Sequence, residues 1–292
     1  MTRAGFALAG MILALGPAAG AVPGPRNVVA VLSSESRYYR EALAGLEAEL
    51  GGPVAVTVLP DRPALPDRVR VIVAFGARAA RASFPSRATL VYCLAPGVRV
   101  EAGGGRMAVR VDMLPPARAV LARLRELQPG LRTLAVFWLS GSVEDAVRGM
   151  REAAAAAGLA LRDARLRDAA ELPDRLRGLR DKPDAIWIPP DPLLVTERNF
   201  AVLREYSWAN GVPIYAPTAG LAEKGAAVAL SSGYQDIGRA AALAVRNILE
   251  DGTPPEAVYP ERLETALNLG AAARTGLVFS RSILASADRV IP

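Results

Sequence analysis

The chain has 292 residues, of which 51% are hydrophobic and 22% are charged, a composition typical of a globular protein and not of a disordered one. This length is enough for one large domain or for two lobes of ordinary size. The formal net charge is +6, but the arginines are scattered among acidic residues and no basic block with interleaved aromatics occurs, so nucleic-acid binding is not expected.

The first residues predict a secretory signal peptide. Arg3 precedes an apolar run over residues 4–15, which is followed by a Gly-Pro pair and by Ala-Gly-Ala at residues 19–21. A short positive segment, a hydrophobic segment of about a dozen residues and a small-residue cleavage site are the marks of such a peptide. We expect cleavage after Ala21 and export to the periplasm; an uncleaved N-terminal anchor is the alternative.

Strand-like and helix-like segments then alternate along the first half of the chain. Prolines 60, 63 and 66 occupy the ten residues between Leu59 and Arg70, so the helix that normally connects two parallel strands is expected to be missing there or reduced to a turn. The predicted strands of this half are Val28–Leu32, Val54–Leu59, Arg70–Phe75, Thr89–Leu94 and Met107–Val111.

The second half repeats this alternation after a helix predicted over Pro115–Leu127. Several runs are almost continuously apolar, which is typical of parallel strands covered on both faces. We therefore predict an α/β fold with two Rossmann-like lobes, parallel sheets and a cleft at the carboxyl ends of their strands. The predicted strands are Thr133–Trp138, Leu159–Ala164, Ala185–Ile188, Pro213–Tyr215 and Ala227–Leu230.

Most catalytic arrangements are excluded by composition. The chain holds no His and a single Cys, so Ser-His-Asp and Cys-His sites cannot form and the commonest zinc ligands are absent. No G-x-S-x-G, G-x-G-x-x-G or P-loop motif occurs; Gly103–Gly105 resemble a phosphate loop only superficially. We expect no metal, no cofactor and no enzyme activity, although a hydrolase that uses paired carboxylates stays open as an alternative.

Polar and aromatic residues follow the predicted strand ends and form the candidate ligand site. Hydroxyl groups at helix N-termini suit a carboxylate, Asp191 suits an ammonium group and the aromatic rings suit an apolar body, so a small zwitterion is the expected ligand. The serines could instead only cap helices, Ser142 with Asp145 in a capping box. Asp191, which precedes Pro192, could likewise only cap the following helix, and Trp138 could lie in the core. The candidates are Ser33, Ser34, Tyr38, Gly76, Ala77, Trp138, Ser140, Ser142, Asp191 and Thr218.

The segments "PDAIWIPPDPL", "GVPIYAPTAGLAEKGAAVALSSGYQDIG" and "LNLGAAARTGLVFSRSILASADRVI" are the most distinctive of the chain. Through them the sequence, from about Asn27 to Ile291, resembles the substrate-binding proteins of ABC transporters with the type I periplasmic-binding fold, in the group that includes tryptophan- and tyrosine-binding proteins. The first lobe is shorter than is usual in that family. The resemblance implies two lobes joined by three crossovers, comprising residues 22–112 with about 233–260, and residues 113–232 with about 261–292.

The resemblance further implies capture of a small amino-acid-like ligand in the cleft between the lobes, for delivery to the membrane permease of an ABC importer. We expect a monomer. A sensory module of the same fold, with a sensor kinase as its partner, is the alternative that the shortened first lobe favours.

Overall fold

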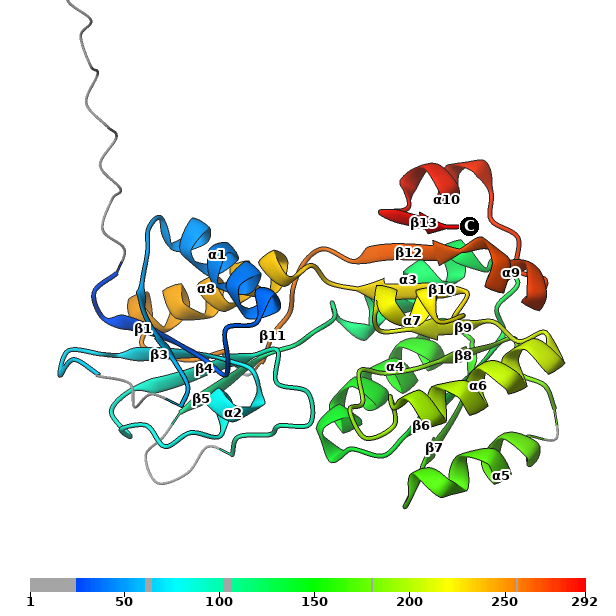
Figure 1. The fold of residues 1–292 in the computed structure, drawn as a ribbon, viewed down its shortest axis with the longest axis horizontal. Coiled ribbons are helices and arrows are strands. Elements are labelled where there is room, and N and C mark those ends of the chain that lie inside the picture. Colours follow the sequence, from blue (N-terminus) through cyan, green and yellow to red (C-terminus); the bar gives the residue numbers. More distant parts are fainter. Residues whose placement is uncertain (1–24, 61–64, 102–106, 180, 256) are drawn as a thin grey trace, which may run out of the picture.

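The computed structural model describes residues 25–60, 65–101, 107–179, 181–255 and 257–292. The predicted signal peptide and Gly103–Gly105 lie outside these residues. Two sheets form the two halves of an elongated molecule (Figure 1). Within the described ranges, no helix is both long and apolar enough to cross a membrane.

The first sheet is entirely parallel and has the strand order β11-β5-β4-β3-β1-β2. Every residue of β1, β3 and β4 is buried, because helices and loops cover both faces, which accounts for the continuous apolar runs of these strands. We call this sheet and its helices the first lobe. Its elements are β1 (Val28–Leu32), α1 (Arg37–Leu50), β2 (Ala55–Val58), β3 (Val71–Phe75), α2 (Ala77–Ala80), β4 (Thr89–Cys93), β5 (Ala108–Val111), α8 (Tyr234–Glu250) and β11 (Ala257–Val258).

The second sheet has the order β13-β12-β10-β9-β8-β6-β7, and its pairs are parallel except for β10 with β12. We call it and its helices the second lobe. Its strands are β6 (Thr133–Trp138), β7 (Ala160–Arg165), β8 (Ala185–Trp187), β9 (Ile214–Ala216), β10 (Val228–Ser231), β12 (Glu264–Asn268) and β13 (Arg289–Ile291). Its helices are α3 (Ala117–Leu127), η1 (Gly141–Val143), α4 (Glu144–Ala156), η2 (Ala169–Glu171), α5 (Leu172–Arg177), α6 (Glu197–Asn210), α7 (Ala219–Glu223), α9 (Leu269–Thr275) and α10 (Arg281–Ser286).

The chain passes between the lobes three times. Residues 112–116 connect β5 to α3, residues 232–233 connect β10 to α8, and residues 259–263 connect β11 to β12. We call these the first, second and third connections. All three run through the middle of the molecule, where the two halves meet (Figure 1).

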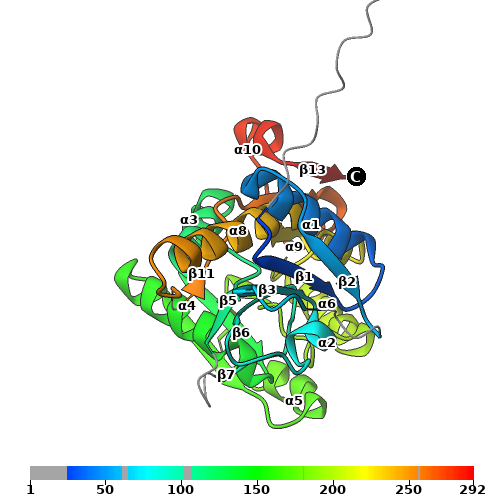
Figure 2. The ribbon, with the colours of Figure 1, turned by 90° about the vertical axis from the view of Figure 1, so that its left-hand side faces the viewer.

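Helix α8 packs against α1 at unusually short range, and the two helices lie side by side in both views (Figures 1 and 2). A Cβ atom on Gly45 would lie 2.1 Å from the carbonyl oxygen of Gln235, and one on Gly238 would lie 1.9 Å from that of Ala42. The two backbones are therefore in direct contact, which only glycine permits at these positions. Although α8 comes late in the sequence, its apolar face completes the core of the first lobe.

The predicted fold class is confirmed, with strand β12 as the antiparallel exception. Strands β1 and β6 have the predicted limits, and the other predicted strands shift by a residue or two at their ends. No helix occurs among the described residues between β2 and β3, as the prolines there predict. The short strands β11 and β13 and the five-residue strand β12 were not predicted.

Candidate functional site

The carboxyl ends of strands from both lobes meet across a narrow cleft. The turns after β4 and β5 face Ser142, Val143 and Pro190 of the second lobe, and together they line a cavity of about 50 Å³. The lobes are close at this edge, since a Cβ atom on Gly97 would lie 2.9 Å from Cγ of Pro192. Open α/β sheets bind their ligands at strand ends of this kind.

The two serines after β1 have different environments. Ser33 is buried, and its Oγ accepts the backbone N–H of Ala79 at 2.9 Å, so it holds α2 against β1. Ser34 is exposed. Neither of them caps α1, because the N-cap of that helix is Ser36, whose hydroxyl accepts the N–H of Tyr38. Of this pair, only Ser34 is open to a ligand.

Gly76 occupies the turn after β3 for a steric reason. Its φ of 94° and ψ of 166° are accessible only to glycine, and a Cβ atom would lie 2.3 Å from the Tyr39 hydroxyl and 2.6 Å from Ser33 Oγ. Gly76 therefore lets α1 and the turn after β1 come close to the start of α2. Ala77, the next residue, opens this four-residue helix.

Tyr38 lies near the second connection. Its side chain is 54% exposed, and its ring centroid is 4.8 Å from that of Tyr234, the first residue of α8. The ring thus rests on the start of α8 and leaves its other side open to solvent.

Asp191 follows β8 and is fully buried. Its Oδ2 accepts the backbone N–H groups of Leu139 and Ser140 at 2.6 and 2.8 Å, and its Oδ1 accepts those of Leu193 and Leu194 at 3.0 and 3.4 Å. The carboxylate therefore fastens the turn after β6 to the turn after β8. Both oxygens of Asp191, the predicted partner of a ligand ammonium group, are thus occupied by backbone N–H groups and shielded from solvent in this structure.

The turn after β6 also differs from its prediction. Ser140, not Ser142, is the capping residue: its Oγ accepts the N–H of Ser142 at 3.2 Å and caps η1. Helix α4 begins at Glu144 without a side-chain cap, so the predicted capping box of Ser142 and Asp145 does not form. Ser142 is half-buried and lines the narrow cleft cavity.

Trp138 belongs to the core of the second lobe, which was the alternative for this residue. The Arg165 guanidinium lies 4.9 Å from the centre of its ring and covers it. Thr218 lies at the end of β9 with an exposed side chain that makes no capping hydrogen bond. The predicted residues therefore divide into those that shape the turns and those still open to a ligand, namely Ser34, Tyr38, Ser142 and Thr218.

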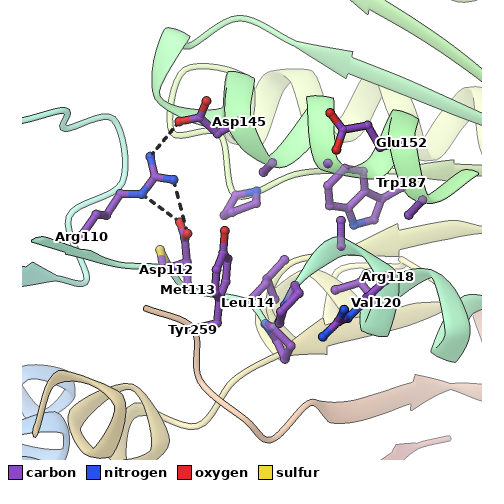
Figure 3. A pocket seen from close by; sticks show the side chains of 17 residues that line it. Arg110, Asp112, Met113, Leu114, Arg118, Val120, Asp145, Glu152, Trp187 and Tyr259 are labelled. Carbon is purple, nitrogen blue, oxygen red and sulfur yellow. Dashed lines mark hydrogen bonds and ion pairs between the residues drawn. The ribbon is translucent and has the colours of Figure 1, made fainter. Parts of the chain in front are cut away.

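A larger cavity, of about 360 Å³, lies at the first connection (Figure 3). Helices α3 and α4 form two of its walls, Trp187 and Pro190 contribute from the end of β8, and Tyr259 contributes from the third connection. Arg110 and Asp112 reach it from the end of β5. None of these residues was predicted, although Asp112 directly follows a strand, the same signal that singled out Asp191.

Arg110 forms ion pairs within and between the lobes. Its Nε is 3.0 Å from Asp112 Oδ1, and its Nη1 is 3.6 Å from Oδ2 of Asp145 on α4 (Figure 3). Burial lowers the pKa of the Arg110 guanidinium, but Asp112, Tyr92 and Asp145 together more than offset this, so the pKa is raised overall. Burial raises the pKa of Asp112, and Arg110 opposes that change only in part.

The described residues include no group of three or more Cys, Asp or Glu side chains that could hold a metal ion. Cys93 is buried at the end of β4, and burial raises the pKa of its thiol, which is therefore protonated at neutral pH. The thiol is thus unsuited to act as a nucleophile in this environment.

Comparison with known proteins identifies similar chains. Residues 114–291 match the family described as ABC transporter substrate binding protein. Among solved structures, a ligand-free, open substrate-binding protein with adhesive properties from Clostridium difficile is 15% identical, with a TM-score of 0.64 over 91% of this chain and 99% of that one. An ABC domain in complex with L-Trp from Streptococcus pneumonia is 17% identical, with a TM-score of 0.58 over 90% and 100% of the two chains.

A conserved domain protein from Vibrio cholerae is likewise 17% identical, with a TM-score of 0.58 over 91% of this chain and 99% of that one. A comparison with curated protein sequences gives no match. At these identities the solved structures support the two-lobed fold.

Proposed function

Because the chain belongs to the ABC transporter substrate-binding protein family, we propose that it captures a small amino-acid-like solute between its lobes and presents it to the permease of an ABC importer. The observation that carries this proposal is the cleft to which strand ends of both lobes contribute. A ligand that contacts both lobes at once favours the closed arrangement over the open one, and a permease can distinguish the two.

The open hydroxyl groups around the strand ends support a polar solute. Ser34 and Thr218 are exposed at the ends of β1 and β9, and Ser142 lines the cleft. We assign these hydroxyls to the carboxylate of the ligand and Tyr38 to its apolar part. The L-Trp in the complex from Streptococcus pneumonia belongs to the same chemical class. Asp191 acts indirectly, by positioning the turn that carries Ser142.

The proposal includes the cellular location and the moving parts. We infer that the chain is exported to the periplasm after cleavage at Ala21. We further infer that residues 22–112 with about 233–260 move as one body, and residues 113–232 with about 261–292 as the other. The three connections then act together as the hinge between the two bodies.

Thermal unfolding in the presence of a panel of amino acids tests this function. A ligand that binds only the folded state at about 100 times its Kd adds about 2.7 kcal/mol of stability. We expect at least one member of the panel to raise the Tm, and Thr218→Val to weaken that effect. Ser86→Ala is the matched control, because Ser86 is an exposed hydroxyl that precedes β4, at the opposite end of its sheet.

A panel that leaves the Tm unchanged would count against amino-acid capture. Equal losses in Thr218→Val and Ser86→Ala would count against the assignment of the site. If the ligand binds but the protein supports no uptake in vesicles that contain a permease and its ATPase, the sensory alternative replaces transport.

A further inference from the structure

A cavity of about 520 Å³ adjoins the one at the first connection, and the two share Arg110, Asp145 and Tyr259 as lining residues. It draws its walls from both lobes. Arg99 and Arg110 come from the first lobe, while Asp145 and Arg148 come from α4 in the second. None of the hydroxyl groups assigned above to the solute lines this cavity, although Arg110 also lines the narrow cleft cavity that contains Ser142.

Arginine dominates the charge of this cavity. Asp145 Oδ2 is 3.3 Å from Arg99 Nη2 and 3.6 Å from Arg110 Nη1, and its Oδ1 is 2.6 Å from Arg148 Nη2. A single carboxylate thus lies among three guanidinium groups. Even when Asp112 is included as the partner of Arg110, three positive charges face two negative ones. The balance at this point of contact between the lobes is therefore cationic.

The arginines keep donors available for a ligand. A guanidinium group has five N–H donors in a planar arrangement that matches carboxylate and phosphate oxygens. Among the described residues, Arg99 and Arg148 have Asp145 as their ion-pair partner, and their side chains are 56% and 58% exposed. Both therefore have N–H groups that face solvent beside the cavity.

We propose that this cavity binds a small polyvalent oxyanion, a phosphate compound or a di- or tricarboxylate, through Arg99, Arg110 and Arg148. The anion neutralises the positive charge of the arginines that Asp145 and Asp112 do not compensate. Because Arg99 and Arg148 belong to different lobes, the bound anion connects them and stabilises the arrangement in which both lie beside Asp145. The site shares Arg110 with the narrow cleft cavity, but Arg99 and Arg148 line only the anion cavity, and the proposal does not depend on amino-acid capture.

Isothermal titration of the purified protein with pyrophosphate and with citrate, at a constant ionic strength of about 0.15 M, tests the proposal. We expect saturable binding of at least one of them, and the preferred anion distinguishes phosphate from carboxylate chemistry. Loss of a charge-assisted contact in Arg148→Gln should weaken binding about tenfold or more. Asp145→Asn should strengthen binding, because it removes the carboxylate that competes for the same arginines.

Arg151→Gln is the matched control. Arg151 is also on α4 and is 52% exposed, but it pairs with Asp163 on β7 and does not line the cavity. We expect the affinity of this variant for the anion to change by less than about twofold. A nonspecific attraction between the anion and the net positive charge of the protein would instead weaken equally in both variants. The absence of saturable binding for both anions, or equal losses in the two variants, would overturn the proposal. Circular dichroism of each variant establishes that it is folded.

Discussion

Asp191→Asn should lower the free energy of unfolding of the second lobe by about 2–4 kcal/mol. The buried carboxylate accepts four backbone N–H groups, two on each oxygen. An amide keeps one acceptor and replaces the other with a donor, so two N–H groups lose their partner in either orientation. Each buried polar group left unsatisfied costs about 1–3 kcal/mol. The hydrogen bond from the Leu194 N–H is long, at 3.4 Å, and therefore weak. Its loss costs little, so the total for two groups should lie toward the lower end of the sum of their costs.

Thermal unfolding followed by tryptophan fluorescence measures this loss, since Trp138 and Trp187 both lie in the core of the second lobe. At about 2–4 °C per kcal/mol, the Tm should fall by about 5–15 °C. Asp184→Asn is the control: its Oδ2 accepts the N–H groups of Arg132 and Thr133 at the other end of β6, but the residue is only half-buried. Water can replace those bonds, so its Tm should fall less.

A Tm for Asp191→Asn equal to or above that of Asp184→Asn would contradict the stabilising role of the Asp191 carboxylate. The pair also separates stability from function. Asp191 fixes the turn that carries Ser142, so its replacement should weaken solute binding, whereas replacement of Asp184, at the far end of the strand, should not.

Three further predictions follow from steric fit and from burial. Gly76→Ala should destabilise the first lobe by more than about 1 kcal/mol, because it adds both strain at positive φ and a clash with the Tyr39 hydroxyl; urea unfolding measures this. Gly238→Ala should destabilise the first lobe more, by about 3 kcal/mol or above, because its Cβ atom would clash with backbone. Gly149→Ala is the control in the same assay: its Cβ atom would meet only a side chain, at 3.4 Å, and the substitution should be close to neutral. Burial raises the pKa of the Cys93 thiol, so the unfolded chain ionises first, and stability should fall as the pH rises above about 8.5. Cys93→Ala should flatten that pH dependence of the urea midpoint, and an unchanged slope would contradict the assignment.

The buried parallel strands could be predicted from the sequence because burial on both faces produces continuous apolar runs. Strands β1 and β6 are the best examples, and their limits agree with the prediction. The edge strands β11 and β13 could not be predicted from the sequence. They have only two and three residues, each pairs with a single neighbouring strand, and such short segments carry no distinctive hydrophobic pattern. The prolines between β2 and β3 were informative because they exclude a helix whatever the surroundings.

The candidate site was only partly predictable. A residue type and a position after a strand identified Asp191, but they could not reveal that the backbone N–H groups of Leu139 and Ser140, in the distant turn after β6, bind its carboxylate. Similarly, Arg110 and Asp145 lie on different lobes, and their ion pair depends on how the lobes meet. Hydrophobic patterns in the sequence indicate which face of a helix or strand packs on the sheet of its own lobe. Contacts between lobes are determined by the connections, which have no periodicity to detect.

The close contact of α8 with α1 also determines the order in which the protein can be assembled. The apolar face of the first sheet that these two helices cover stays incomplete until residues 234–250 have emerged from the ribosome or the export channel. By then the strands β6 to β10, five of the seven strands of the second sheet, have already appeared. Domains generally fold as units during synthesis. The second lobe is completed later still, because β12, α9, α10 and β13 follow α8 in the sequence. The first lobe is therefore expected to close first, once a segment made almost two hundred residues after its beginning has returned, as the 197 positions that separate Glu49 from its partner Arg246 illustrate.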